Sequence, residues 1–180
     1  MTRARLGTLL VLALVLVGRP TQAALPAPGA KAPAFALATL DDPARIVASR
    51  DLFRNATTLV SFFATWCEPC KKELGELKRL EPHYRAQGFQ VALICLDIMG
   101  ARNVKSYLEE AGALGLRVLT DRSGEASNRY GVVHLPTNVL VGADGTVISS
   151  WDTYRPDRLR ELEVYLGRLP VRASAGTAPP

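Results

Sequence analysis

Two long apolar runs and the amphipathic stretch between them set the predicted framework of this chain. Residues 57–63 and 89–98 are rich in β-branched and apolar side chains, which is typical of strands buried on both faces. Between them, the spacing of apolar residues over 68–85 predicts a helix, which Pro82 should kink or end. Consecutive strands joined through a helix lie parallel in a sheet.

Shorter patterns extend this unit at both ends. Phe35, Leu37 and Leu40 predict a segment at the edge of the core. Further strands are expected at residues 46–47, 117–119, 137–141 and 146–150, the last two joined as a hairpin through Asp144-Gly145. Further helices are expected at residues 49–54, 102–111, 123–130 and 155–169, with Ser49 and Ser123 capping the two short ones. Together they predict an α/β domain over residues 24–170, with a mixed central sheet flanked by helices on both faces.

The two ends of the chain do not fit this domain. Residues 1–23 have a basic start, an apolar run over 9–17 and small residues before a cut expected after Ala23, which is the order of a secretory signal peptide. An uncleaved anchor is the alternative, because Arg19 stands close to the cut. Residues 24–33 are expected to form an extended lead-in, and the Pro/Ala/Gly-rich residues 171–180 a disordered tail.

Export changes the meaning of the formal charge of +5. Without Arg3, Arg5 and Arg19, 19 basic side chains face 17 acidic ones, and the net charge is +2. That charge is too small to indicate a nucleic-acid or membrane-surface partner, and no basic run with interleaved aromatics is present.

Cys67 and Cys70 stand three positions apart, just after a predicted strand and at the start of a predicted helix. One helical turn would bring them to one face, at a Cα separation of roughly 5–6 Å that allows a disulfide. The unpaired N–H groups at a helix N-terminus favour a thiolate, which is the species that attacks another disulfide. The spacing therefore favours reversible dithiol–disulfide exchange.

Two other uses of this cysteine pair are less well supported by the sequence. A zinc site needs a second pair of ligands, and the chain offers only Cys95, His83 and His134, without suitable spacing. A purely structural disulfide suits an oxidising compartment, but so short a loop removes little entropy from the unfolded chain.

Four stretches together resemble the thioredoxin superfamily, and more narrowly the exported TlpA/ResA-type thiol–disulfide oxidoreductases. They are Ala32-Pro33-Ala34-Phe35-Ala36-Leu37, the stretch from Phe63 through Trp66-Cys67-Glu68-Pro69-Cys70 to Glu73, Leu135-Pro136-Thr137, and Val141-Gly142-Ala143-Asp144-Gly145 with Val147. The resemblance covers residues 29–169. It implies a thioredoxin-like fold with an extra N-terminal segment and a helical insertion over residues 99–116.

The resemblance also implies roles for particular residues. Cys67 would be the exposed nucleophile and Cys70 the resolving thiol of a redox-active disulfide. Pro136 would be cis and would face the disulfide, with Leu135 and Thr137 beside it to pair with an extended substrate. The implied substrates are protein cysteines such as those of apocytochrome c. A membrane thiol-transferring reductase would recharge the protein after each reaction. No cofactor or metal is required, and a monomer is expected.

The residues around the pair favour a reductant. Glu68 puts a negative charge beside the nucleophile, and Pro69 removes a backbone donor from the helix start, so both disfavour the Cys67 thiolate. A strongly stabilised thiolate would instead make an oxidant. Trp66 is expected either to shield the disulfide or to lie in the core.

Glu73 falls inside the apolar stripe formed by Leu74, Leu77 and Leu80 on the predicted helix. Burial there would raise its pKa and allow it to exchange a proton with Cys70. Thioredoxins place an acid at the position of Ser61 instead, and in the TlpA/ResA group an acid matching Glu73 resembles its replacement. A glutamate reaching out to solvent is the alternative.

Other functions and residues are weaker candidates. A disulfide-forming oxidase would differ in reduction potential. A peroxidase of the same fold is disfavoured because its motif positions hold Val60 and Ala64. A copper-delivery protein would use both cysteines and a distal histidine. Cys95 is expected to be an inert core thiol, His134 a loop or core residue, and His83 a surface residue.

Overall fold

The structure is a computed structural model that describes residues 24–98 and 100–172. The expected signal peptide and residues 173–180 of the expected tail lie outside the described residues. Within the described part of the chain, no helix combines the length and the apolar composition that a membrane crossing needs.

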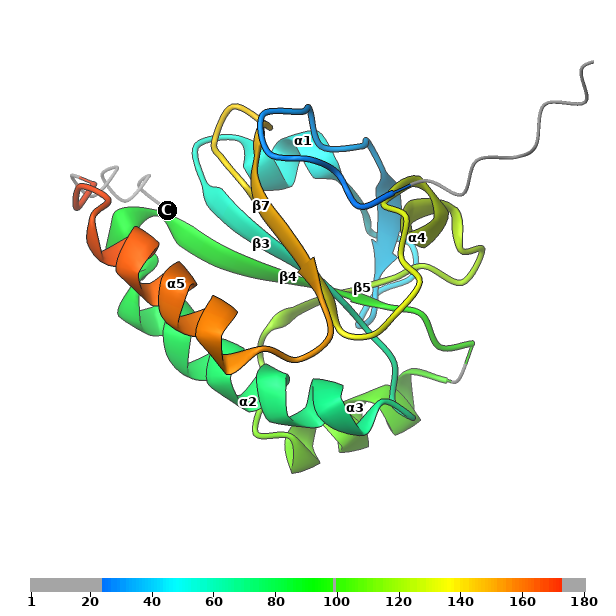
Figure 1. The fold of residues 1–180 in the computed structure, drawn as a ribbon. Coiled ribbons are helices and arrows are strands. Elements are labelled where there is room, and N and C mark those ends of the chain that lie inside the picture. Colours follow the sequence, from blue (N-terminus) through cyan, green and yellow to red (C-terminus); the bar gives the residue numbers. More distant parts are fainter. Residues whose placement is uncertain (1–23, 99, 173–180) are drawn as a thin grey trace, which may run out of the picture.

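The described residues form one mixed seven-stranded sheet in the order β2-β1-β5-β4-β3-β6-β7 (Figure 1). The strands are β1 (Ala36–Thr39), β2 (Ile46–Ala48), β3 (Thr57–Phe63), β4 (Phe89–Cys95), β5 (Arg117–Thr120), β6 (Thr137–Val141) and β7 (Val147–Asp152). The β3–β4 and β4–β5 pairs are parallel, and the remaining pairs are antiparallel. The predicted mixed sheet and hairpin are confirmed.

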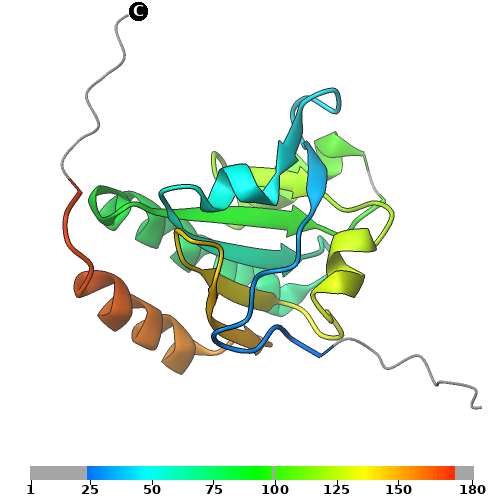
Figure 2. The same cartoon turned by 90° about the horizontal axis from the view of Figure 1, so that it is seen from above.

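Helices cover both faces of this sheet, as expected (Figures 1 and 2). They are α1 (Ser49–Phe53), α2 (Glu68–His83), α3 (Ala101–Glu110), α4 (Glu125–Arg129) and α5 (Pro156–Gly167), with a 3₁₀ turn at Arg85–Gln87. A hydrophobic core lies on each face of the sheet. Helices α2, α3 and α5 pack on one face, and helices α1 and α4 pack on the other. The helix α3 is the predicted insertion.

Strand β3 is the centre of the molecule, because all seven of its residues are buried. Leu59 and Phe63 contact the core under α2, whereas Val60 and Phe62 contact the opposite core. A strand with apolar layers on both sides needs the unbroken apolar run that predicted it.

Several predicted boundaries were wrong by a few residues. Strand β4 ends at Cys95 rather than at residue 98, because the chain then leaves the sheet and Ile98 is 82% exposed. Helix α2 ends at His83, one residue past Pro82. Helix α5 ends at Gly167, two residues before the predicted end.

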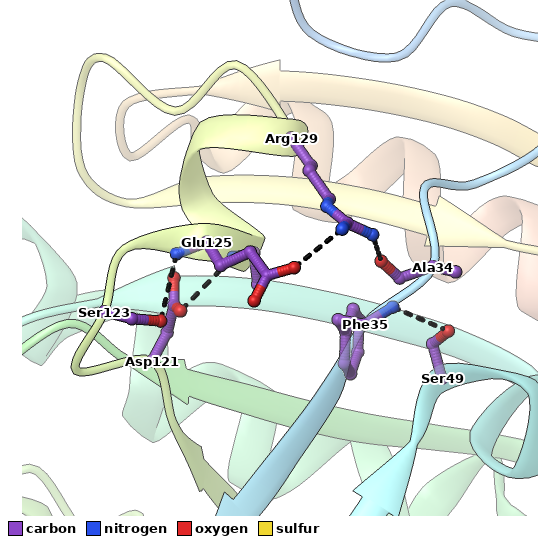
Figure 3. Close-up of polar contacts among 8 residues, drawn as sticks. Ala34, Phe35, Ser49, Asp121, Ser123, Glu125 and Arg129 are labelled. Atoms are coloured by element: carbon purple, nitrogen blue, oxygen red, sulfur yellow. Dashed lines mark hydrogen bonds and ion pairs between the residues drawn. The ribbon is translucent and has the colours of Figure 1, made fainter.

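The extra N-terminal segment is fastened to the edge strand β7 and to helix α4. Gly29 N–H donates to the Val147 carbonyl of β7 at 2.8 Å. Figure 3 shows the guanidinium of Arg129 donating to the Ala34 carbonyl at 2.9 Å while it pairs with Glu125 at 2.6 Å. The segment therefore bridges β7 and α4.

Both predicted serine caps were wrong. Ser49 is the first residue of α1, and its hydroxyl accepts from the Phe35 N–H at 3.1 Å (Figure 3). Ser123 Oγ accepts from the Glu125 N–H at 3.4 Å, and Ser123 is not the N-cap residue of α4. The N-cap position of α4 is held by Gly124, which offers no side chain, and the capping carboxylate is instead that of Asp121, whose oxygens accept from the N–H groups of Ala126 at 3.2 Å and Ser127 at 2.8 Å.

We therefore expect Asp121→Ala to lower the free energy of unfolding by about 1–2 kcal/mol, the usual effect of losing a helix cap. Ser123→Ala is the matched control and should lower it by less than about 0.5 kcal/mol. Urea unfolding of both variants measures the difference. Equal losses would contradict the assignment of Asp121 as the cap.

Candidate active site

The two cysteines lie where the buried strand β3 gives way to helix α2. Cys67 is the N-cap of α2, and its Sγ accepts from the Cys70 N–H at 3.3 Å. The two sulfurs are bonded at 2.08 Å, and the Cα atoms are 5.3 Å apart. The predicted placement of the pair at a helix N-terminus, beside the carboxyl end of a parallel strand, is confirmed.

The residues of the redox turn differ in how much of their surface is exposed. Cys67 retains 5% of its surface and Cys70 none, so Cys67 is less exposed than expected but is still the more accessible cysteine. Trp66 is 75% exposed, so of its two expected roles the alternative of a core residue was wrong. Glu68 and Pro69 are both exposed at the start of α2.

The loop before β6 stands beside this turn. Thr137 opens β6 and pairs with Phe62, one residue before the end of β3. The Leu135–Pro136 peptide is cis, as expected. Pro136 is buried, and Thr137 Oγ1 donates to the His134 carbonyl at 2.6 Å while the His134 side chain is exposed.

Glu73 is fully buried under the site. Leu74, Leu77 and Leu80 are buried on the same helix, so the predicted apolar stripe is confirmed. The Asn138 amide donates to both Glu73 carboxyl oxygens, at 2.9 and 3.1 Å. The alternative of a glutamate reaching out to solvent was wrong.

Burial raises the pKa of Glu73 to about 7, and the charge of Glu76 acts in the same direction. The hydrogen bond from Asn138 opposes this rise in pKa and offsets only part of it. Ser61 lies directly opposite Asn138 in the sheet and, like Asn138, lowers the pKa of Glu73, but more weakly. Its hydroxyl makes no hydrogen bond of standard geometry within the described residues.

Asn138 and Asp97 are site residues that the sequence prediction missed. Asn138 is an amide within an otherwise apolar strand end, which is the only local signal. The Asp97 carboxylate accepts from Thr65 N–H at 2.7 Å and from Thr65 Oγ1 at 3.2 Å, and so holds the turn that leads to Cys67. Asp97 had no signal in the sequence, because its partner lies 32 positions away.

Cys95 lies in the core as expected and donates its S–H to Asp97 at 3.4 Å. Burial raises the pKa of this thiol to about 12, which keeps it protonated. His83 is exposed, as predicted. Within residues 24–98 and 100–172, no three His, Cys, Asp or Glu side chains gather in a way that could hold a metal ion.

Residues 28–150 match the sequence model of the AhpC/TSA family. The chain belongs to the AhpC/TSA family. It is 30% identical over 142 residues to the thiol-disulfide oxidoreductase ResA of Bacillus thuringiensis subsp. konkukian, covering 78% of each chain. It is 31% identical over 120 residues to ResA of Geobacillus thermodenitrificans, covering 66% of each.

Solved structures of this AhpC/TSA member's relatives agree with these matches. A thiol-disulfide oxidoreductase from Bacteroides fragilis superimposes with a TM-score of 0.61 at 28% identity, covering 74% of this chain and 99% of that one. A candidate thiol:disulfide interchange protein DsbE from Chlorobium tepidum gives 0.71 at 29% identity, covering 81% and 99%. The thioredoxin-like fold and the class of thiol–disulfide oxidoreductase are thereby confirmed.

The raised pKa of Glu73 predicts a pH-dependent stability. Between its usual pKa and about 7, the folded protein binds a proton that the unfolded chain releases, so the free energy of unfolding falls as pH rises through this window. The loss should reach about 3 kcal/mol. Glu73→Gln should abolish this fall in urea unfolding of the oxidised protein at pH 5 and pH 8.

Glu109→Gln, on the exposed side of α3, is the matched control and should keep the pH dependence of the unsubstituted protein. If Glu73→Gln keeps it as well, Glu73 is ionised while buried and the assigned pKa is wrong.

Proposed function

We propose that this protein is an exported reductant that acts on protein cysteines by dithiol–disulfide exchange. The observation that carries the proposal is the Cys67–Cys70 disulfide, placed with Cys67 as helix N-cap and Cys70 buried behind it. A buried carboxyl, Glu73, stands one helical turn after Cys70 on the same helix. The ResA names of the relatives support the same chemistry.

In the reduced protein, the Cys67 thiolate would attack one sulfur of a substrate disulfide. The Cys67–substrate bond forms, and the other substrate sulfur leaves as a thiolate that takes up a proton. The Cys70 thiolate then attacks Cys67 Sγ, the substrate's remaining sulfur leaves, and the Cys67–Cys70 disulfide forms. Two electrons pass to the substrate.

Glu73 would take the proton of Cys70 in the second step. A general base works best when its pKa lies near the working pH, and the pKa of about 7 of Glu73 meets this condition. Residues three apart on a helix lie on one face, so the carboxyl and the Cys70 sulfur share the buried side of α2.

The direction of electron flow follows from the charges at the helix start. Glu68 is exposed next to Cys67, and Pro69 offers no N–H. The turn contributes the Cys70 N–H as a donor to Cys67 Sγ. Because few groups stabilise the Cys67 thiolate, the disulfide state of the pair is favoured, and the reduced protein is then a good electron donor.

Substrates would bind across the exposed face of Trp66 and the loop formed by Leu135, Pro136 and Thr137. Apocytochrome c, before haem attachment, is the substrate class that the resemblance to the TlpA/ResA group suggests, and a membrane thiol-transferring reductase would recharge the protein. Residues 1–23 would direct export, cleaved or kept as an anchor. The protein would act as a monomer without a cofactor.

The exchange reaction predicts a trapped intermediate. Cys70→Ser should accumulate a mixed disulfide with a cysteine-containing substrate peptide, because the attack that releases the substrate is lost. Cys67→Ser should form none, and Cys95→Ser should behave as the unsubstituted protein. Non-reducing gel electrophoresis and mass spectrometry detect the adduct. Absence of an adduct on Cys70→Ser would rule out exchange through Cys67.

The reductant assignment predicts a reduction potential well below that of strong oxidants, which is about −120 mV. Equilibration of the Cys67–Cys70 couple with glutathione or dithiothreitol buffers measures it. A value close to −120 mV would reverse the direction and make the protein a disulfide-forming oxidase.

A further inference from the structure

The insertion helix α3 makes a hydrogen bond to the first cysteine. The Tyr107 hydroxyl donates to the Cys67 carbonyl at 2.9 Å. Its ring stacks on Phe63, the last residue of β3, with centroids 6.2 Å apart and planes 12° apart. Tyr107 therefore contacts both the last residue of β3 and Cys67, the N-cap of α2.

Helix α3 is held firmly enough to fix this contact. Val104 and Leu108 are buried against the sheet. Lys71, in the first turn of α2, pairs with Glu110 at the end of α3 at 2.8 Å. The hydroxyl of Tyr107 is thus anchored on a helix that packs beside the start of α2.

The carbonyl that receives this hydrogen bond belongs to the N-cap. It also accepts from the Cys70 N–H at 3.1 Å. On the other side of the turn, Asp97 holds the Thr65 N–H at 2.7 Å. The backbone that carries the Cys67 sulfur is therefore restrained from two sides, by Asp97 after β4 and by Tyr107 on α3.

We propose that Tyr107 is a positioning residue of the exchange reaction: by donating to the Cys67 carbonyl, it fixes the Cys67 sulfur at the helix N-terminus and favours its thiolate. This inference rests on the proposed function. A carbonyl oxygen carries partial negative charge close to its own side chain, and a hydroxyl hydrogen on that oxygen offsets part of this charge.

The charged and titratable groups that face Tyr107 make its hydroxyl a permanent donor. Burial raises the pKa of Tyr107 to about 12, and Glu68 on α2, Asp97 after β4 and Cys95 on β4 add to the rise. Because two of these neighbours are carboxylates, removal of the donor leaves the Cys67 thiolate in a more negative environment.

Tyr107→Phe tests the proposal, because it removes the hydroxyl and keeps the stacked ring. The rate at which iodoacetamide alkylates Cys67 in the reduced protein is measured against pH. We expect the profile to move to higher pH, with a rate near pH 7 that falls several-fold. The equilibrium with glutathione should shift several-fold toward the oxidised protein. Tyr165→Phe, on α5, is the matched control and should change neither.

A purely structural role of Tyr107 would lower the urea midpoint and leave the alkylation profile and the glutathione equilibrium in place, which would overturn the proposal. If Tyr107→Phe does not fold, a fluorinated tyrosine at position 107 replaces it. This stronger donor should move the profile to lower pH, and an unmoved profile overturns the proposal.

Failure of the proposed function is detected separately. Alkylation needs no substrate and reports on Tyr107 even where Cys70→Ser forms no mixed disulfide with the peptide. A shifted profile without an adduct would sustain Tyr107 as a positioning residue for the thiol and reject the exchange with protein substrates. An adduct together with an unshifted alkylation profile would support exchange with protein substrates and reject Tyr107 as a positioning residue.

Discussion

The junction between β3 and α2 is the constraint on which the rest of the site depends. Strand β3 is buried along its full length between two apolar layers, so its end cannot shift without disturbing both cores. The chain turns from this fixed point straight into a helix N-terminus. Cys67 is therefore placed by packing, and the unpaired N–H groups of α2 give its sulfur a local polar environment.

A row of polar side chains runs through the apolar layer beneath this junction. Ser61, Asn138 and Trp151 stand opposite one another on β3, β6 and β7. Asn138 uses its N–H groups on Glu73, whereas Ser61 Oγ, Asn138 Oδ1 and Trp151 Nε1 have no hydrogen-bond partner within the described residues. This row brings polar side chains close to the buried Glu73 carboxyl, which accepts from Asn138.

Local sequence was enough to predict the parts of the site that are local. The cysteine spacing, Pro136 and the position of Glu73 within the leucine stripe each depend on neighbours within one helix or loop, and the structure places them as expected. Asn138, Asp97 and Tyr107 act on partners 65, 32 and 40 positions away, and no single-sequence pattern encodes such pairs. The same reason explains the wrong cap of α4: Ser123 has the better sequence position, but Asp121 is held by the end of β5 and reaches the helix.

Asn138 offsets only part of the rise that burial causes in the pKa of Glu73, and this balance bears on the proposed function. An isolated carboxyl in this core would remain protonated at every working pH, and a fully paired one would remain ionised. Asn138 supplies two donor contacts and Glu76 a nearby negative charge, and the balance leaves the pKa at about 7. A stronger partner in place of Asn138 would stabilise the fold above neutral pH, but it would also lower the basicity that the proposed proton transfer from Cys70 needs. The stability that the core gives up at Glu73 is thus the condition for the proton transfer that we propose between Cys70 and this carboxyl.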